Sequence, residues 1–90
     1  MTVAEERIER LVELAQEAVR SGDPDLSRQY VRRARRLAER NRVRLPRRFK
    51  RFSCDRCDTY LIPGRNARVR TRSGRVVVTC DCGEHARYPY

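Results

Sequence analysis

Two close pairs of cysteines are the residues whose type and spacing most clearly indicate chemistry in this chain. Two residues separate Cys54 from Cys57, one separates Cys80 from Cys82, and 22 lie between the pairs. Two tight turns that each present two thiolates can close a tetrahedral site around one metal ion, the pattern of a zinc ribbon. Four thiolates leave no open position for water. The spacing therefore predicts one structural zinc ion rather than a catalytic one.

Other interpretations of the cysteines stay open at this stage. The segment MTVAEERIER has neither the positive region nor the apolar run of a secretory signal. We therefore expect a cytoplasmic, reducing environment in which disulfides are disfavoured, and a redox or iron role is the remaining alternative. The C-x-C spacing leaves it undecided whether Cys80 and Cys82 both reach the metal. His85 would be a substitute ligand, although a lone surface histidine is the commoner interpretation.

The residues between and after the cysteine pairs have the pattern of a small antiparallel sheet. Residues 68–71 and 76–79 alternate or are β-branched, and the glycine at position 74 supplies a turn between them. A third strand over 85–90 would complete a three-stranded antiparallel ribbon.

The amino-terminal part has the pattern of two helices joined by a tight turn. Thr2 and Glu5 form a capping box, and apolar residues then recur at helical spacing until Gly22. Asp23 as N-cap and Pro24 at the first helical position begin the second helix at once. The chain is thus predicted to be a small α+β zinc protein with an antiparallel two-helix hairpin (1–42), a basic connector (43–53) and a zinc ribbon (54–90).

The connector reads as extended, because Pro46 ends any continuation of the second helix. Its two aromatic residues, Phe49 and Phe52, have two interpretations. They can stack on RNA bases, or they can complete the core of a metal domain that has few other large apolar groups. We favour the core.

Charge is distributed unevenly along the 90 residues. The net charge is +10, and 21 of the 22 basic residues are arginine. Residues 1–27 carry −4, residues 28–52 carry +11 and residues 53–90 carry +3. One basic segment beside an acidic helix suggests a polyanion contact at one place and a different contact at another. The short length excludes a multidomain enzyme, and no apolar run is long enough for a membrane span.

The chain from about residue 28 to its end also resembles a known family, the archaeal ribonuclease P protein component 4 family. The motifs that carry the resemblance are Arg44-Leu45-Pro46, Pro63-Gly64, residues 66–70 and residues 87–90. The resemblance implies two long helices followed by a zinc ribbon, a structural role beside a catalytic RNA, and pairing with a second protein subunit that has an Sm-like barrel. That pair is expected to act on the specificity domain of ribonuclease P RNA, with precursor tRNA contacted indirectly.

Carried onto this sequence, the resemblance gives three sets of candidate residues. The metal ligands are Cys54, Cys57, Cys80 and Cys82. The RNA-binding residues are Arg32, Arg35, Arg36, Arg40, Arg42, Arg47, Arg48, Arg51, Arg68, Arg70 and Arg72. The partner-binding residues are Ile8, Leu11, Val12, Leu14, Leu26, Tyr30 and Leu37.

These observations lead to one principal hypothesis and one alternative. The principal hypothesis is an RNA-binding, zinc-stabilised subunit of ribonuclease P that supports RNA-catalysed removal of the 5′ leader from precursor tRNA. No set of residues in the sequence has the pattern of an active site, so we expect no catalytic residues in this chain. The alternative is a zinc-ribbon adaptor of another ribonucleoprotein, ribosomal or transcription-type, that acts mainly through protein contacts.

Overall fold

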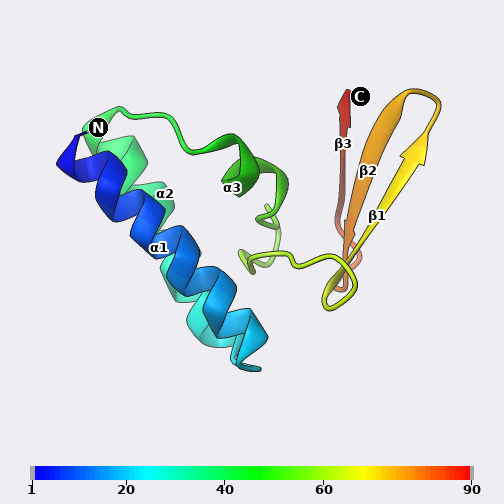
Figure 1. Cartoon of the computed structure of the whole chain (residues 1–90), viewed down its shortest axis with the longest axis horizontal. Helices are drawn as coiled ribbons and strands as arrows, with labels where there is room; N and C mark the ends of the chain where they lie inside the picture. The colour runs from blue at the N-terminus through cyan, green and yellow to red at the C-terminus, as the bar shows by residue number, and fades with distance from the viewer. Residues whose placement is uncertain (1, 90) are drawn as a thin grey trace.

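A computed structural model describes residues 2–89, which form a helix pair, a one-turn helix and a three-stranded sheet along the chain (Figure 1). The elements are α1 (Val3–Arg20), α2 (Pro24–Asn41), α3 (Arg47–Arg51), β1 (Ala67–Arg72), β2 (Arg75–Cys80) and β3 (His85–Pro89). The sheet is antiparallel with strand order β1-β2-β3. The predicted α+β class, with a helical hairpin before a three-stranded ribbon, is confirmed. No helix within residues 2–89 is long and apolar enough to cross a membrane.

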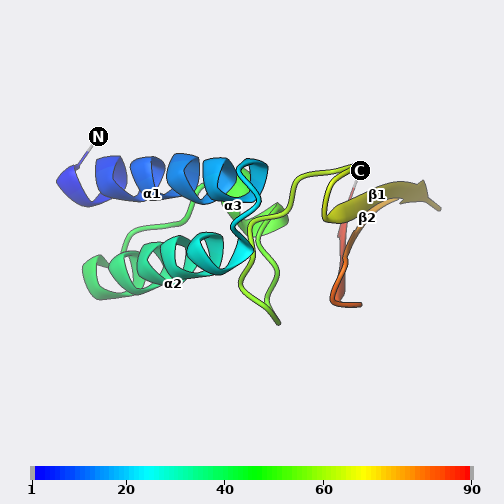
Figure 2. The ribbon, with the colours of Figure 1, turned by 90° about the horizontal axis from the view of Figure 1, so that it is seen from below.

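The two long helices begin and end where their capping residues predict. The Oγ1 atom of Thr2 accepts a hydrogen bond from the backbone N–H of Glu5 at 3.2 Å, which satisfies one unpaired donor at the start of α1. Gly22 follows the end of α1 with φ of +81°, and the Asp23 side chain caps α2 by accepting from the N–H of Leu26 at 3.1 Å. With only Ser21, Gly22 and Asp23 between them, α1 and α2 run antiparallel, side by side (Figure 2).

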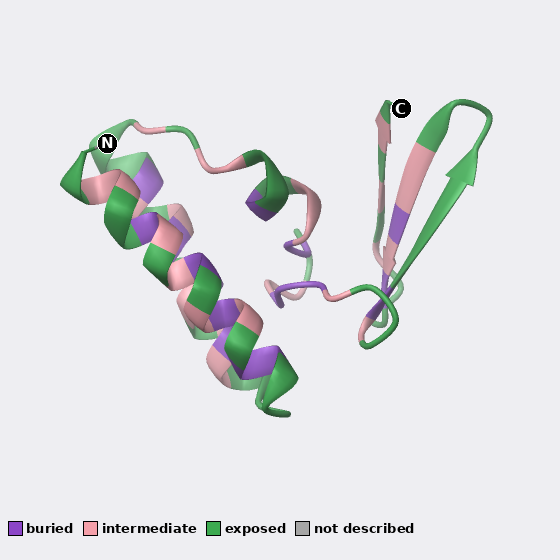
Figure 3. Ribbon diagram, in the orientation of Figure 1, coloured by how far each residue is buried: buried purple, intermediate pink, exposed green. Residues whose placement is uncertain are grey.

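The apolar stripes of the two helices face each other and form the larger core. Figure 3 shows that buried residues recur along the length of both helices. The buried members of this cluster are Ile8, Val12, Ala15, Val19, Val31, Ala34, Ala38, Phe49 and Tyr60. Phe49 and Tyr60 come from outside the hairpin, so the helix pair shares its core with the segment that leads to the sheet.

The connector is not fully extended, and this corrects the sequence prediction. Residues Arg47–Arg51 form the single helical turn α3 after Pro46. The turn places Phe49 at 0% exposure in the larger core, and the Ser53 hydroxyl donates a hydrogen bond to the Phe49 carbonyl oxygen at 2.6 Å. Burying a phenylalanine side chain stabilises a fold by about 1.5 to 3 kcal/mol, and arginine and lysine have good helix propensity. Phe49 therefore belongs to the core, as expected, but reaches it through a helix.

The sheet is closed at one end by a two-residue turn between β1 and β2. Arg72 pairs with Arg75, and the turn residues Ser73 and Gly74 have φ of +50° and +75°. Positive φ at both positions is typical of the type I′ turn, whose twist matches that of paired strands. The strands lie at the far end of the molecule from the helix pair, and α3 lies between the two parts (Figures 1 and 2).

Candidate metal centre and basic surfaces

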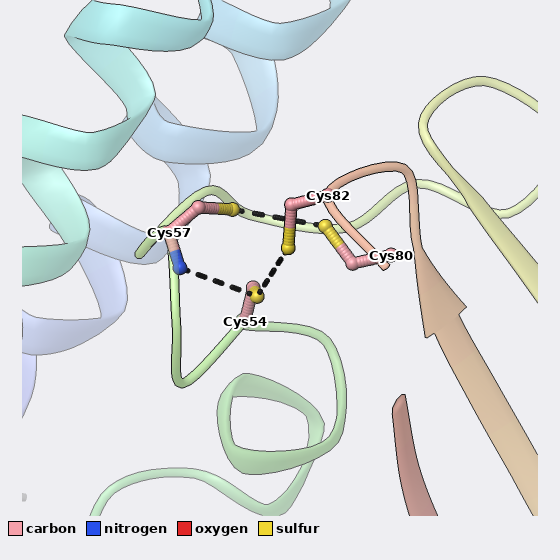
Figure 4. Close-up of side chains that lie close together, drawn as sticks. All are labelled: Cys54, Cys57, Cys80 and Cys82. Atoms are coloured by element: carbon pink, nitrogen blue, oxygen red, sulfur yellow. Dashed lines mark hydrogen bonds between the residues drawn. The ribbon is translucent and has the colours of Figure 1, made fainter. Parts of the chain in front are cut away.

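The four cysteine side chains converge on one point between two loops. Their Sγ atoms all lie within 4.8 Å of one another. Cys54 and Cys57 come from the loop after α3, whereas Cys80 ends β2 and Cys82 follows it (Figure 4). The Sγ atoms of Cys54 and Cys82 are 3.5 Å apart, and those of Cys57 and Cys80 are 3.7 Å apart.

These distances fit a tetrahedral metal site rather than disulfides. Four sulfurs at about 2.3 Å from a central zinc ion would be separated by about 3.8 Å. A disulfide needs sulfurs about 2.05 Å apart, and all four cysteines are free. The cluster can therefore hold one metal ion, and both cysteines of the C-x-C pair contribute to it. His85 is not part of the cluster.

Backbone hydrogen bonds explain why each loop presents its two sulfurs inward. The N–H groups of Arg56 and Cys57 both donate to the Cys54 Sγ atom at 3.4 Å. In the second loop the N–H of Gly83 donates to the Cys80 carbonyl oxygen at 2.9 Å, with Gly83 at φ of +98°. This glycine lets the shorter C-x-C turn close without a Cβ in the left-handed region.

The thiols of the cluster differ in how readily they ionise. Burial raises the pKa of the Cys54 and Cys80 thiols above the ordinary value of cysteine. Burial also opposes ionisation of Cys57, but hydrogen bonds with the side chain and backbone of Thr59 outweigh it and lower the pKa of Cys57 to about 6. A metal that binds all four thiolates must displace protons from Cys54 and Cys80, so metal affinity falls as the pH falls.

Helix α2 holds the first cysteine loop through a cluster of charged groups that the sequence did not reveal. Asp58, at φ of +63°, accepts hydrogen bonds from Arg35 and, at 2.9 Å, from Arg32. Arg35 also donates to the Ser53 hydroxyl and to the Cys54 carbonyl oxygen, both at 3.2 Å. The α2 arginines predicted to bind RNA thus include two that make contacts within the chain, and Arg35 is turned inward with its side chain 27% exposed.

The remaining arginines of the predicted RNA surface divide in the same way. Arg48 lies 3.5 Å from a Glu9 carboxylate oxygen, and the Arg51 guanidinium lies 5.4 Å from the centre of the Tyr88 ring. The others on α2, after it and on α3 are exposed and form no ion pair with a residue in the described range: Arg36, Arg40, Arg42 and Arg47.

The outer face of the sheet carries a second set of arginines. The pairings Arg68 with Thr79, Arg70 with Val77, and Val77 with Arg87 place these side chains on one face. Arg72 and Arg75 join them there. Four of these arginines line a shallow depression of about 530 Å³ together with Ser73, Val77 and Thr79: Arg70, Arg72, Arg75 and Arg87. Arg75 and Arg87 were missing from the sequence prediction, although strand alternation could have found Arg87.

The opposite face of the sheet is apolar and packs toward the metal loops. Val78 and Cys80 form a second buried cluster with Cys54, Leu61 and Ala67, and Tyr88 packs against it. The Tyr88 hydroxyl donates to the Lys50 carbonyl oxygen at 3.0 Å. The arginine face of the sheet therefore points away from this cluster and toward solvent.

The residues predicted to bind a protein partner do not all lie at the surface. Ile8 and Val12 are 1% and 0% exposed, so they pack against α2 inside the chain rather than facing a partner. This corrects that part of the prediction. The physical reason is that α2 covers most of the apolar side of α1. The other residues of the set are half-buried: Leu11, Leu14, Leu26, Tyr30 and Leu37.

Comparison with known proteins agrees with this arrangement. A family model described as the "RNAse P Rpr2/Rpp21/SNM1 subunit domain" matches residues 7–83. Ribonuclease P protein component 4 of Halobacterium salinarum is 70% identical, over 99% of this chain and 96% of that protein. A chain of an archaeal ribonuclease P solved with mature tRNA superposes with a TM-score of 0.91 at 44% identity, over 98% of this chain and 77% of that chain. The solved structure entitled "Pfu Rpp21" gives a TM-score of 0.65 at 39% identity, over 94% and 97%.

Proposed function

Because the chain belongs to the Rpr2/Rpp21/SNM1 family of ribonuclease P subunits, we propose that it is a zinc-stabilised, RNA-binding subunit of this endoribonuclease. In this role it supports removal of the 5′ leader from precursor tRNA by the catalytic RNA, and it acts in the cytoplasm. The observation that carries the proposal is the match of nearly the whole chain to one chain of a ribonuclease P bound to tRNA.

Zinc is the metal that best fits the thiolate cluster. A tetrahedral set of four sulfurs is typical of zinc or of iron–sulfur chemistry, and structural zinc sites are closed in this way. Cys54, Cys57, Cys80 and Cys82 would hold the ion and join the loop after α3 to the end of β2. The ion would thereby cross-link the two loops and stabilise the ribbon more than the small second buried cluster does alone.

The arginine face of the sheet is the stronger of two RNA-binding surfaces. It presents Arg68, Arg70 and Arg72 together with Arg75 and Arg87, and the three strands contain no acidic residue. Within the described strands it carries no Phe, Tyr or Trp ring, because Tyr88 points to the opposite face, and its one imidazole is that of His85, which pairs with Thr79. Such a surface suits contacts to phosphates and 2′-hydroxyl groups of folded RNA rather than stacking on single-stranded bases.

The second RNA-binding surface lies on the helical side, at Arg36, Arg40, Arg42 and Arg47. Arg32 and Arg48 are exposed and can add to it, each at the cost of an ion pair within the chain. Because the sheet arginines point away from the metal loops that lie between sheet and helices, the two surfaces would contact different segments of RNA. We propose that the chain divides into a hairpin (1–42), a connector (43–53) and a ribbon (54–90). The helical RNA surface then belongs to the hairpin and connector, and the sheet surface belongs to the ribbon.

The helix pair is the proposed site for a second protein subunit, of the Sm-like barrel type that the family resemblance implies. Leu14 and Leu26 are half-buried, Val3 is 66% exposed, and this part of the chain is acidic. We expect Leu14→Glu to weaken binding of the second subunit by at least about tenfold in sedimentation, because a carboxylate would be buried at the contact. RNA binding by the isolated chain should be unchanged. Equal losses of both would contradict a separate partner surface, and Glu13→Gln is the matched control beside it.

Reconstitution of precursor-tRNA cleavage tests the proposed function directly. Ribonuclease P RNA is combined with the other protein subunits, with and without this chain, at limiting magnesium. We expect the cleavage rate to rise when this chain is added and the chain alone to cleave nothing. A cleavage rate that is unchanged when this chain is added would favour the alternative role as an adaptor in another ribonucleoprotein. Cleavage by the isolated chain would contradict the assignment of catalysis to the RNA.

A further inference from the structure

Thr59 lies between a metal-ligand sulfur and an arginine of α2. The Nε atom of Arg28 donates a hydrogen bond to the Thr59 Oγ1 atom at 3.0 Å, and the same oxygen lies 3.3 Å from the Cys57 Sγ atom. Thr59 is 4% exposed and the Arg28 side chain 34%. Three side chains from α2 and from the first cysteine loop thus form a line that ends on the sulfur.

Once a metal is bound, the chemistry of these groups fixes the direction of the hydrogen bonds. A guanidinium has no acceptor, so Thr59 must accept from Arg28. A hydroxyl oxygen has two lone pairs, so a Cys57 thiol would donate its S–H proton to the same Thr59 oxygen. A metal-bound thiolate carries no proton and can only accept, so in the metal-bound centre the Thr59 hydroxyl donates to the Cys57 sulfur.

Further hydrogen bonds connect α2 to the residues on either side of Thr59 in this loop. The Ser27 hydroxyl oxygen accepts from the N–H of Tyr60 at 3.2 Å, next to the Arg28 contact, and Asp58 is held by Arg32 and Arg35. A hollow of about 350 Å³ beside the sulfurs is lined by Arg28, Thr59 and the exposed Cys82. The hydrogen bond from Thr59 therefore orders the ligand on a side of the site that is open to solvent.

We propose that Arg28 and Thr59 are positioning residues of the metal centre, acting in series to orient the Cys57 thiolate and to lower the charge that it presents to the metal. This inference rests on the proposed zinc site and assigns a role to two residues that are not metal ligands. Partners of this kind usually change metal affinity by about 10- to 100-fold. Because Arg28 lies on α2, the two positioning residues also make metal affinity depend on the position of this helix.

The test compares zinc affinity in full-length variants by competition with a chromophoric chelator. Thr59→Val keeps the shape of the side chain but removes the hydroxyl, and we expect it to weaken zinc binding by about tenfold. Thr59→Ser restores the hydroxyl and should recover most of the affinity. Arg28→Met leaves Thr59 without its donor and should show a smaller loss of the same kind. In the cobalt-substituted protein, the sulfur-to-cobalt charge-transfer band should move in Thr59→Val and return in Thr59→Ser, which a loss of packing alone would not produce.

Matched controls are Thr71→Val on β1 and Arg33→Met on α2, which are exposed and lie outside this line of contacts. Both should bind zinc like the unchanged protein. If Thr59→Val proves unfolded, the Arg28→Met measurement decides the question. The proposal is overturned if both Thr59→Val and Arg28→Met bind zinc with unchanged affinity, or if Thr59→Ser is as weak as Thr59→Val. Failure of the unchanged protein to bind zinc would instead overturn the proposed metal centre itself.

Discussion

Removal of the metal unfolds the sheet and loosens its attachment to the helices, which is the largest effect on stability that we expect for this chain. The second buried cluster is small, and Cys54 and Cys80 are two of its five members. Metal binding in small zinc domains contributes about 10 to 16 kcal/mol of apparent free energy, whereas a core of this size supplies about 3 to 5 kcal/mol. Without the ion, burial of Leu61, Ala67 and Val78 cannot offset the conformational entropy of the ordered strands.

The effect should extend beyond the sheet, because α2 contacts the first cysteine loop. Asp58 and Tyr60 are held by residues of α2, and Tyr60 is part of the helical core. Once the loop is released, Arg35 loses its partners and the core loses one aromatic ring. We therefore expect helical structure to remain but to melt at a lower temperature.

Chelation followed by amide NMR measures both effects in one sample. Signals from β1, β2 and β3 should collapse to the narrow range of an unfolded chain, while signals from α1 and α2 shift but stay dispersed. Addition of Zn²⁺ should restore the spectrum, and addition of Mg²⁺ should not, since magnesium prefers oxygen ligands. Strand signals that survive complete chelation would contradict a structural role for the metal.

The parts of the fold that sequence predicted are those set by neighbouring residues. Thr2, Gly22 and Asp23 cap helices through contacts three or fewer residues away, and their geometry is as expected. The cysteine cluster was also predictable, because few arrangements other than a shared metal explain two close pairs of thiolates. Even the short C-x-C turn fits once Gly83 is allowed a left-handed backbone.

The features that sequence did not predict depend on contacts between distant segments. The contact of Arg35 with Asp58 spans 23 residues, and the one of Arg28 with Thr59 spans 31. In the sequence each of these arginines looks like any other in a basic helix. Helix α3 was missed for a similar reason, because its charged residues hide the single apolar side chain, Phe49, whose burial determines the conformation.

The distribution of partners among the arginines changes how the net charge should be interpreted. The segment with the highest charge density, residues 28–52, contains Arg28, Arg32 and Arg35, which make contacts within the chain. The sheet carries less charge in total, but its arginines have no acidic neighbour on the three strands. Exposed cations without partners release more counterions on binding phosphate than cations that must first leave an ion pair. The weaker sequence signal therefore marks the surface that we propose as the main RNA contact.

Replacing Arg68, Arg70 and Arg72 by glutamine should consequently cause the largest loss of RNA binding. All three are exposed on β1, so the change should leave zinc affinity and the far-UV spectrum unaltered. Loss of three phosphate contacts reduces the slope of log affinity against log salt by about 2 to 3 and weakens binding to ribonuclease P RNA by about 10- to 100-fold at moderate salt.

The matched control is the triple replacement of Arg7, Arg10 and Arg20 by glutamine, which removes the same charge from exposed positions on α1. If RNA responds only to net charge, both triple variants lose affinity equally and the sheet has no special role. If the arginine face of the sheet is the contact, only the β1 variant changes the salt slope. Titrations of both variants against ribonuclease P RNA at several salt concentrations separate these outcomes, because a difference in slope counts the phosphates contacted and not the total charge of the protein.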